Sequence, residues 1–299
     1  MKIRANSLGI EVEDSGADGT QAQRPVVLLV MGLGTQLTAW PPAFVQALVD
    51  AGYRVVRFDN RDIGLSDKLD HLGQPNLVWA MVKLKLGLVV TPPYSLQDMA
   101  LDAIGVLDAL GIRQAHVLGI SMGGMIAQRV ALAAPERVLS LTSIMSSSGA
   151  RGLPQAGNDI LRLMMDKPAD SAKEAIVAHT VQLLQAIGSP GFPTAEVDLR
   201  AQVLKAFERN YHPAGSLRQT MAIGCDTARA DLLPRIKAPT LVVHGRADRL
   251  VPFACGEDTA RRIPGARFEA VDGMGHDLPP GVVQRLLTFL LPHLKAATV

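Results

Sequence analysis

Short, almost continuously apolar runs recur along the chain, separated by segments whose apolar positions repeat at helical spacing. Runs of this kind are typical of strands buried on both faces of a parallel sheet, because a strand with one wet face alternates instead. Several of the helical segments end at glycine or proline, residues that stop helices. We expect strands at residues 25–30, 53–58, 114–118, 138–144, 236–244 and 266–271, and helices at 42–51, 95–110, 122–133, 252–262 and 281–296.

This alternation of strands and helices predicts an α/β fold built on a doubly wound, mostly parallel sheet. Residues 1–13 precede the alternation and have the pattern of an N-terminal hairpin. Ligands of such sheets bind beyond the carboxyl ends of the strands, so the loops there are where chemistry is expected.

Residues 150–235 do not follow the alternation, because they contain several helical patterns and no convincing strand. One pattern begins with Ser171 followed by Glu174, the spacing of a capping box, which predicts that Ser171 caps the next helix. Both ends of this insertion return to sheet strands. We therefore expect an α/β core domain formed by residues 1–149 and 236–299, with 150–235 as a helical cap over the strand ends.

A second departure is the segment 67–94, which is longer than most connections between a strand and a helix. Two apolar runs, 77–82 and 86–90, flank Lys83 and Lys85. Such a segment could line the mouth of a site or touch a lipid surface, but a short helix docked on the protein body is favoured.

Composition narrows the classes of protein that this chain can be. Of its 299 residues 48% are hydrophobic and 19% are charged, which supports a large core and argues against disorder. The formal net charge is +2 with both signs interspersed, so nothing points to nucleic acid.

The lack of an apparent targeting signal and the cysteine usage favour a cytoplasmic protein. The N-terminus has no apolar core of a signal peptide, and no apolar run approaches the ~18 residues of a membrane span. Cys225 and Cys255 lack the spacing of metal ligands, and buried free thiols are favoured over a disulfide. We expect a cytoplasmic protein.

The candidate chemistry begins at residues 119–123 (GISMG), between the expected strand 114–118 and the helix 122–133. A serine flanked by glycines at a strand-to-helix turn has the pattern of a nucleophile elbow. The turn holds the serine in a strained conformation, and a Cβ at either glycine would clash with neighbouring backbone. The pentapeptide alone occurs by chance, so the strand and helix around it carry the prediction that Ser121 is a nucleophile.

A serine nucleophile needs a histidine base and a carboxylate that orients the histidine. In this kind of sheet both follow the serine along the chain, the acid first, each in a loop after a late strand. Asp248 and His276 have these positions, after the strands 236–244 and 266–271. We therefore predict that Ser121, Asp248 and His276 form a catalytic triad.

Each partner has a plainer explanation. Asp248 could be a turn residue that caps the next helix, and His276 could be a histidine of a surface loop. Asp272 and Asp277 flank His276, but adjacent side chains point apart, so neither easily reaches its ring. His244 follows a strand directly and is expected to pack beside the acid loop. The common order and context of the three triad residues outweigh these explanations.

An oxyanion needs two backbone N–H donors held in place, each typically worth about 3 kcal/mol of barrier. One should belong to Met122, the residue after the serine. The other should come from the loop after strand 25–30, where Gly32 and Gly34 permit close backbone approach. We expect Leu33 to provide it, and the alternative is an ordinary glycine turn.

The chain resembles the α/β-hydrolase superfamily, and more narrowly the branch that contains aclacinomycin methylesterase. The resemblance rests on residues 31–34 (MGLG), 52–66 (GYRVVRFDNRDIGLS), 119–128 (GISMGGMIAQ), 245–248 (GRAD) and 273–276 (GMGH). It covers nearly all of the expected core and none of the insertion. It implies a carboxylic-ester hydrolase that needs no cofactor and works through Ser121, Asp248 and His276.

Two positions differ from the family pattern. Met31 precedes Gly32 where many relatives have histidine, which bears on how this loop is supported. Leu33 stands where cofactor-free haloperoxidases often have an aromatic residue, which disfavours that activity.

The function expected from the sequence is that of a serine carboxylesterase. Its substrate would be an apolar small-molecule ester, methyl esters included, hydrolysed through an acyl-enzyme. Cofactors, metals, nucleic acids and stable membrane insertion are not expected. Two alternatives stay open: a cofactor-free haloperoxidase or perhydrolase that uses the same triad, and a non-catalytic small-molecule receptor or signalling protein with the same fold.

Overall fold

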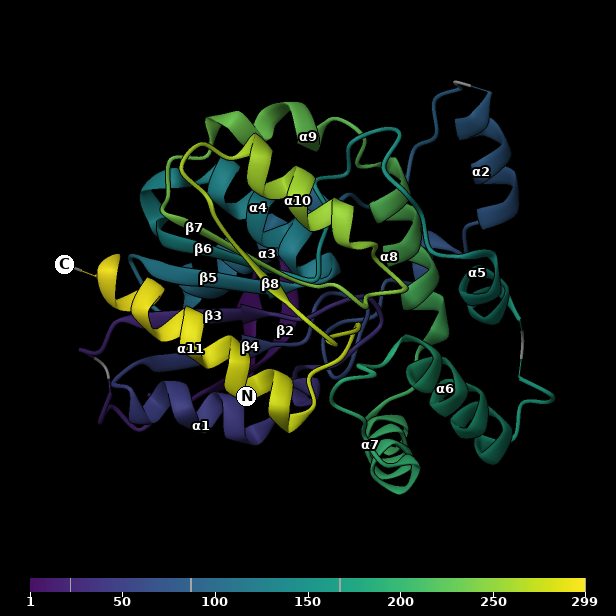
Figure 1. The fold of residues 1–299 in the computed structure, drawn as a ribbon, viewed down its shortest axis with the longest axis horizontal. Helices are drawn as coiled ribbons and strands as arrows, with labels where there is room; N and C mark the ends of the chain where they lie inside the picture. The colour runs from purple at the N-terminus through teal and green to yellow at the C-terminus, as the bar shows by residue number, and fades with distance from the viewer. Residues whose placement is uncertain (22, 87, 167, 299) are drawn as a thin grey trace.

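The computed structural model describes residues 1–21, 23–86, 88–166 and 168–298. Its centre is one eight-stranded sheet, which crosses the middle of Figure 1. The strands, in the order in which they lie side by side, are β1 (Lys2–Ala5), β2 (Leu8–Asp14), β4 (Arg54–Phe58), β3 (Val26–Val30), β5 (Ala115–Ile120), β6 (Val138–Ile144), β7 (Thr240–Gly245) and β8 (Arg267–Val271).

The strand directions confirm the predicted mostly parallel sheet. β1 and β2 form the expected hairpin, and β2 also pairs antiparallel with β4. From β4 to β8 every pairing is parallel. The main difference in bounds is at β7, which begins at Thr240 rather than at residue 236. Pro239 precedes it and has no N–H to give to a ladder.

Helices cover both faces of the sheet, as a doubly wound fold requires. They are α1 (Pro42–Asp50), α3 (Leu96–Ala109), α4 (Met122–Ala133), α10 (Phe253–Arg262) and α11 (Pro280–Ala296). Side chains of β3 alternate between two apolar cores: Val26, Leu28 and Val30 pack with α3 and α4, whereas Val27 and Leu29 pack with α1 and α11. Figure 1 shows these two helix layers above and below the sheet.

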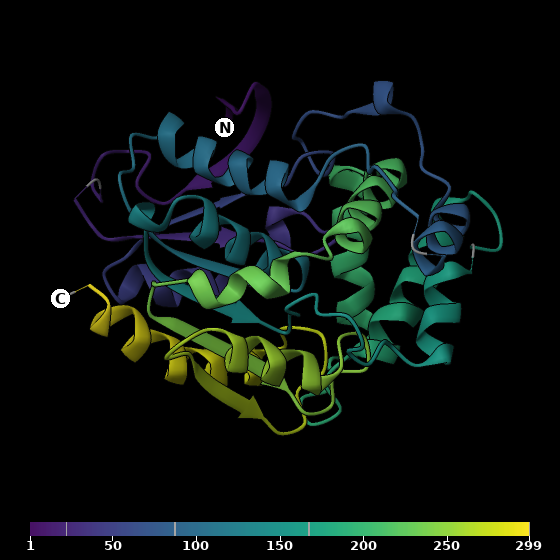
Figure 2. The same cartoon turned by 90° about the horizontal axis from the view of Figure 1, so that it is seen from above.

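Between β6 and β7 the described residues form helices and no strand. The helices are α5 (Asn158–Met165), α6 (Lys173–Ile187), α7 (Glu196–Arg209), α8 (Pro213–Cys225) and α9 (Arg229–Leu232), followed by the 3-10 turn η4 (Leu233–Arg235). Figures 1 and 2 both show α5 to α8 gathered at one end of the sheet. The helical character predicted for residues 150–235 is confirmed.

The insertion is fastened to the core by a buried ion pair. Arg218 of α8 donates from Nε and Nη2 to the two carboxylate oxygens of Asp62, at 2.8 and 2.9 Å, and both side chains are fully buried. Arg218 also donates to Asp70 and to the carbonyl oxygen of Gly73. The hydrogen bonds to Asp62 are the main reason that the pKa of Arg218 is raised.

The helix expected over residues 95–110 begins with a side-chain cap. Ser95 Oγ accepts a hydrogen bond from the N–H of Asp98, and the Asp98 carboxylate accepts one from the N–H of Ser95. These reciprocal bonds form a capping box at the start of α3.

The capping box predicted at Ser171 is wrong. α6 begins at Lys173 with Ala172 as its N-cap, so Glu174 is one position too early in the helix to complete the box. Glu174 pairs instead with Arg200 of α7.

Segment 67–94 forms the short docked helix that the sequence favours. It contains the 3-10 turn η2 (Asp70–Leu72) and α2 (Leu77–Lys85). α2 packs against α8 with Ala80 buried, whereas Val78 and Trp79 stay exposed. Among the described helices there is none with the length and apolar character of a membrane span.

We expect loss of the Arg218 charge to cost far more than loss of an exposed lysine. Arg218→Met leaves the buried Asp62 carboxylate without its main partner, which should lower the free energy of unfolding by about 3–5 kcal/mol. Lys173→Met is the matched control, because Lys173 pairs with Glu208 at the surface and such pairs contribute about 0–1 kcal/mol. Urea unfolding followed by circular dichroism measures both variants. Equal losses would contradict the anchoring role of Arg218.

Candidate active site

Ser121 stands at the turn between β5 and α4 with a backbone φ of 54° and ψ of −125°. A positive φ is strained for a residue with a Cβ, so the surrounding structure must hold it there. A Cβ on Gly119 would lie 2.0 Å from the carbonyl oxygen of Gly123, and one on Gly123 would lie 2.1 Å from that of Val30. Close backbone contact therefore requires both glycines of the elbow.

Hydrogen bonds at both the N–H and the carbonyl group of Ser121 fix this turn. The N–H of Ser121 donates to the carbonyl oxygen of Ile144 at 3.0 Å, and the carbonyl oxygen of Ser121 accepts from the hydroxyl of Ser146 at 2.7 Å. The residue itself is partly exposed. A rigid backbone thus presents an accessible hydroxyl at the end of β5.

The loop after β3 lies directly against Ser121. A Cβ on Gly32 would come within 3.3 Å of Ser121 Cβ and 3.8 Å of its hydroxyl oxygen. The N–H groups of Leu33 and Met122 form no hydrogen bond with any residue that the structure describes. Met122 opens α4, where the first N–H groups have no partner within the helix. A backbone N–H without an acceptor can donate to a negatively charged oxygen.

Asp248 and His276 come together from the loops after β7 and β8. His276 Nδ1 donates to Asp248 Oδ2 at 2.7 Å, and the Asp248 side chain is fully buried. Burial alone would raise the pKa of Asp248, but His276 and hydrogen bonds from His244 and His276 outweigh it and hold the pKa well below its ordinary value. The carboxylate is therefore ionised at neutral pH, where it can stabilise a protonated His276.

Asp248 also holds its own loop. Its Oδ1 accepts hydrogen bonds from the N–H groups of Leu250 and Val251, at 2.9 and 2.8 Å. Asp248 is thus both a turn residue and the partner of His276: Oδ1 holds the turn, and Oδ2 bonds to the His276 ring. His244 packs beside this loop, with its buried Nε2 2.8 Å from the carbonyl oxygen of Val251 and 3.5 Å from Asp248 Oδ2.

The acids on either side of His276, Asp272 and Asp277, bond to other residues. Asp272 is 91% exposed and pairs with Arg246. Asp277 accepts a hydrogen bond from the hydroxyl of Ser189, and burial is the main reason that its pKa is raised. Of the three acids considered, Asp248 is the one bonded to the His276 ring.

Ser189 helps to hold the loop of His276, and the sequence analysis did not predict this contact. It lies between α6 and α7, and its hydroxyl accepts a hydrogen bond from the N–H of Gly275 at 2.8 Å. The N–H of His276 donates to the carbonyl oxygen of Ile187 at 2.8 Å. The insertion thus holds the histidine loop, and no motif in the insertion signals this contact.

Two pairs of candidate residues are brought together: Asp248 with His276, and Gly32 with Ser121. Among the described residues no hydrogen bond joins the Ser121 hydroxyl to His276. Such catalytic hydrogen bonds are often long before substrate binds.

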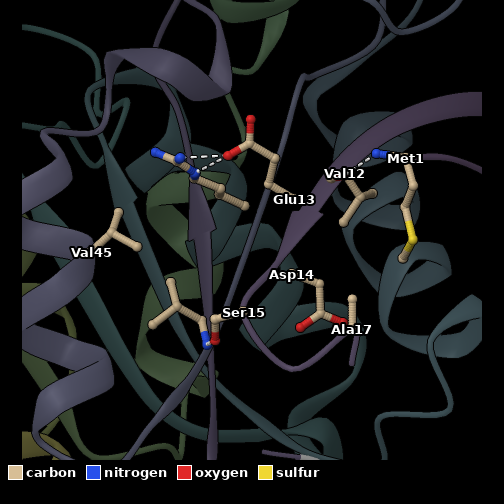
Figure 3. A pocket seen from close by; sticks show the side chains of 9 residues that line it. Met1, Val12, Glu13, Asp14, Ser15, Ala17 and Val45 are labelled. Atoms are coloured by element: carbon tan, nitrogen blue, oxygen red, sulfur yellow. Dashed lines mark hydrogen bonds and ion pairs between the residues drawn. The ribbon is translucent and has the colours of Figure 1, made fainter. Parts of the chain in front are cut away.

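A surface pocket of about 430 Å³ lies away from these residues, between β2, β4 and α1 (Figure 3). The carboxylates of Asp14 and Glu13 in its wall pair with Arg54 and Arg57, so their charges are already neutralised. In the described part of the chain, no three His, Cys, Asp or Glu side chains are grouped as ligands for a metal ion.

The two cysteines are free thiols. Cys255 is buried, as expected, whereas Cys225 is only half-buried.

Known proteins resemble this chain over nearly its whole length. A family model described as the alpha/beta hydrolase fold matches residues 25–279. Rhodomycin D methylesterase DauP from Streptomyces sp. (strain C5) is 30% identical over 300 residues, which cover 94% of each chain. Rhodomycin D methylesterase DnrP from Streptomyces peucetius is 30% identical over 301 residues, again 94% of each chain.

A solved structure with the same fold is the meta-cleavage product hydrolase CumD from Pseudomonas fluorescens IP01. It matches with a TM-score of 0.74 at 20% identity, covering 99% of this chain and 98% of that chain. At this identity the likeness speaks for the fold alone, which agrees with the family model. The chain therefore belongs to the alpha/beta hydrolase fold family, in its methylesterase-like branch, and is a hydrolase.

Proposed function

We propose that the protein is a serine carboxylesterase that cleaves a small-molecule ester through an acyl-enzyme. The observation that carries the proposal is the partly buried hydrogen bond between Asp248 and His276, at the same edge of the sheet as the strained Ser121. The two methylesterases that resemble the chain support the same class of reaction.

In the first half of the proposed reaction, His276 Nε2 accepts the proton of the Ser121 hydroxyl while its oxygen attacks the ester carbonyl carbon. The carbonyl oxygen becomes an oxyanion, which accepts hydrogen bonds from the N–H groups of Leu33 and Met122. His276 then gives its proton to the departing alkoxide. The alcohol leaves, and Ser121 carries the acyl group.

Water completes the cycle. It gives a proton to His276 as it attacks the acyl carbon, and His276 returns that proton to Ser121 as the acid leaves. Asp248 remains ionised throughout and stabilises the imidazolium that forms in each half.

We further propose a methyl ester of an apolar acid as the substrate, because both relatives are named as methylesterases. Residues 150–235 would act as a cap that selects this substrate, over a core of residues 1–149 and 236–299. In support, α8 bonds to the loops after β3 and β4, at the strand ends where ligands of such sheets bind.

An active-site-directed fluorophosphonate should label Ser121 alone. Ser121→Ala should lose the label and lower the turnover of methyl and nitrophenyl esters at least about 10³-fold, because the nucleophile is gone. Ser171→Ala, which removes an exposed serine hydroxyl, is the matched control and should keep both. Labelling without turnover of any ester would favour a receptor, and full activity in Ser121→Ala would exclude the proposed nucleophile.

Asp248→Asn should lower turnover by about 10⁴-fold while the fold stays intact. The amide oxygen can still hold the loop, but the amide group can neither fix the His276 tautomer nor stabilise its charge. Asp272→Asn and Asp277→Asn should cost far less. Turnover and circular dichroism of the three variants test this ranking, and a larger loss in either control would identify a different acid.

Ester hydrolysis should be faster than peroxide chemistry on the same preparation. Both reactions would use Ser121, so they differ in whether water or peroxide reaches the acyl-enzyme. Leu33 provides no aromatic ring against which peroxide could be held. Specificity constants for methyl-ester hydrolysis and for acetate-dependent bromination decide the point, and faster bromination would make the protein a perhydrolase.

A further inference from the structure

A side chain of the insertion holds the loop that carries Leu33. Gln219 of α8 is fully buried, and its Oε1 accepts a hydrogen bond from the N–H of Gly34 at 2.9 Å. Its Nε2 donates to the carbonyl oxygen of Arg61 at 3.0 Å. One amide thus connects the oxyanion loop (residues 31–36) with the loop after β4.

α8 makes tight contacts with the same two loops. A Cβ on Gly215 would come 2.3 Å from the carbonyl oxygen of Asp62, next to the buried pair that Asp62 forms with Arg218. Gly34 has a φ of 66°, and a Cβ there would lie 2.8 Å from the Ser216 hydroxyl oxygen. α8 therefore has little freedom to move relative to either loop.

The carbonyl group that Gln219 contacts is itself rigidly placed. The guanidinium of Arg61 donates to Asp102 Oδ1 at 2.7 Å and to the carbonyl oxygen of Asp98 at 3.1 Å, both in α3. Arg61 and Asp102 are buried. Gln219 thus connects the oxyanion loop, through Arg61, to α3, one of the helices that cover the sheet.

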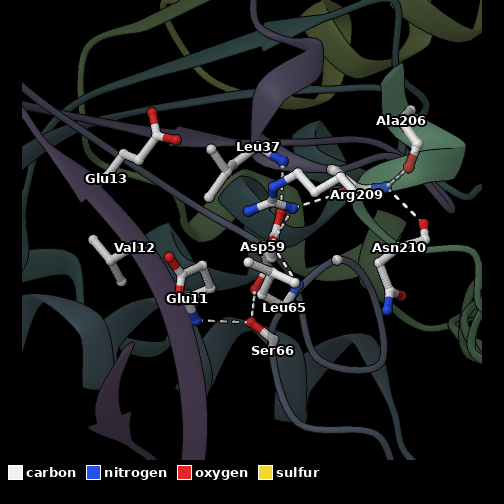
Figure 4. Close-up of polar contacts among 12 residues, drawn as sticks. Glu11, Val12, Glu13, Leu37, Asp59, Leu65, Ser66, Ala206, Arg209 and Asn210 are labelled. Carbon is white, nitrogen blue, oxygen red and sulfur yellow. Dashed lines mark hydrogen bonds and ion pairs between the residues drawn. The ribbon is translucent and has the colours of Figure 1, made fainter. Parts of the chain in front are cut away.

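Other side chains hold the two ends of the oxyanion loop. Asn60 Nδ2 donates to the carbonyl oxygen of Met31 at 2.9 Å. At the other end, Arg209 of α7 donates to Gln36 at 2.6 Å and to Asp59 at 2.7 Å, and Figure 4 shows Arg209 reaching Asp59. Gln219 acts between these ends, on the residue next to Leu33.

We propose that Gln219 is a positioning residue that holds the N–H of Leu33 in the geometry needed to bind the oxyanion. The proposal rests on the esterase function and on the role of Leu33 inferred above. An oxyanion donor works only if it lies about 2.7–3.1 Å from where the charge forms, and a shift of ~1 Å can cost ~100-fold in rate. Gln219 also compensates for Met31, which has no polar group to support the loop.

The experiment compares three variants of the full chain on one methyl ester. Gln219→Leu keeps the size of the side chain but leaves the Gly34 N–H without an acceptor, so kcat should fall ~10–100-fold with KM changed less than about twofold. Gln219→Glu keeps an acceptor for the Gly34 N–H but loses the donor to the Arg61 carbonyl oxygen, so it should recover part of kcat. Thr220→Val is the matched control, because among the described residues the Thr220 hydroxyl bonds to the carbonyl oxygen of Ser216 alone, within α8, and kcat of this variant should be unchanged.

Two readouts separate positioning from a general loss of structure. Titration with a fluorophosphonate counts reactive Ser121 sites, so that kcat is expressed per site. Affinity for a trifluoromethyl ketone, which forms a tetrahedral oxyanion on the serine, should weaken in Gln219→Leu in parallel with kcat. A loss of sites in proportion to the loss of rate, with unchanged ketone affinity per site, would show a merely structural role.

The outcomes distinguish this inference from the esterase proposal. If the unmodified protein neither reacts with the fluorophosphonate nor hydrolyses esters, the esterase proposal fails and takes this inference with it. If it does both and Gln219→Leu keeps its kcat per site, only the role of Gln219 is excluded.

Discussion

The site depends on the strained backbone of Ser121, which is possible only because three glycines let backbone segments touch. Gly119 and Gly123 allow the end of β5, the start of α4 and Val30 to meet, and Gly32 brings the loop after β3 against the serine. A positive φ at a serine costs of order 1–3 kcal/mol, which the packed sheet must offset. The consequence is a hydroxyl at the strand end, beside two N–H groups that have no partner among the described residues.

The insertion is bound to the loops of the proposed catalytic machinery on both sides of Ser121. On one side Gln219 holds the oxyanion loop, and on the other Ser189 and the carbonyl oxygen of Ile187 hold the loop of His276. With these contacts the insertion would do more than cover the proposed site, because its position would also set where the proposed oxyanion donors and the proposed base lie. Changes in the insertion should therefore alter the rate of the chemical step as well as the choice of ester.

The sequence predicts the parts of this structure that depend on local pattern. Buried runs place the strands, and the glycines of residues 119–123 place the elbow, because each needs only near neighbours. Contacts such as Gly34 with Gln219, 185 residues apart, leave no local signal and were not predicted. The capping box predicted at Ser171 fails for the opposite reason. Ser171 and Glu174 have the spacing of a capping box, but the helix begins one residue later than this spacing predicts, and Glu174 pairs with Arg200.

Asp248 shows how one buried acid can serve structure and chemistry together. Its Oδ1 holds the backbone of its own turn, which fixes the direction in which Oδ2 faces the His276 ring. The folded chain holds the pKa of Asp248 below its ordinary value of 3.8, so the ionised form stabilises the fold at neutral pH. That stabilisation is lost as the pH falls from the ordinary pKa of an aspartate towards the lowered pKa of Asp248, far below the pH at which a histidine base is neutral. The charge that faces the His276 ring is therefore also part of what holds the loops after β7 and β8 together.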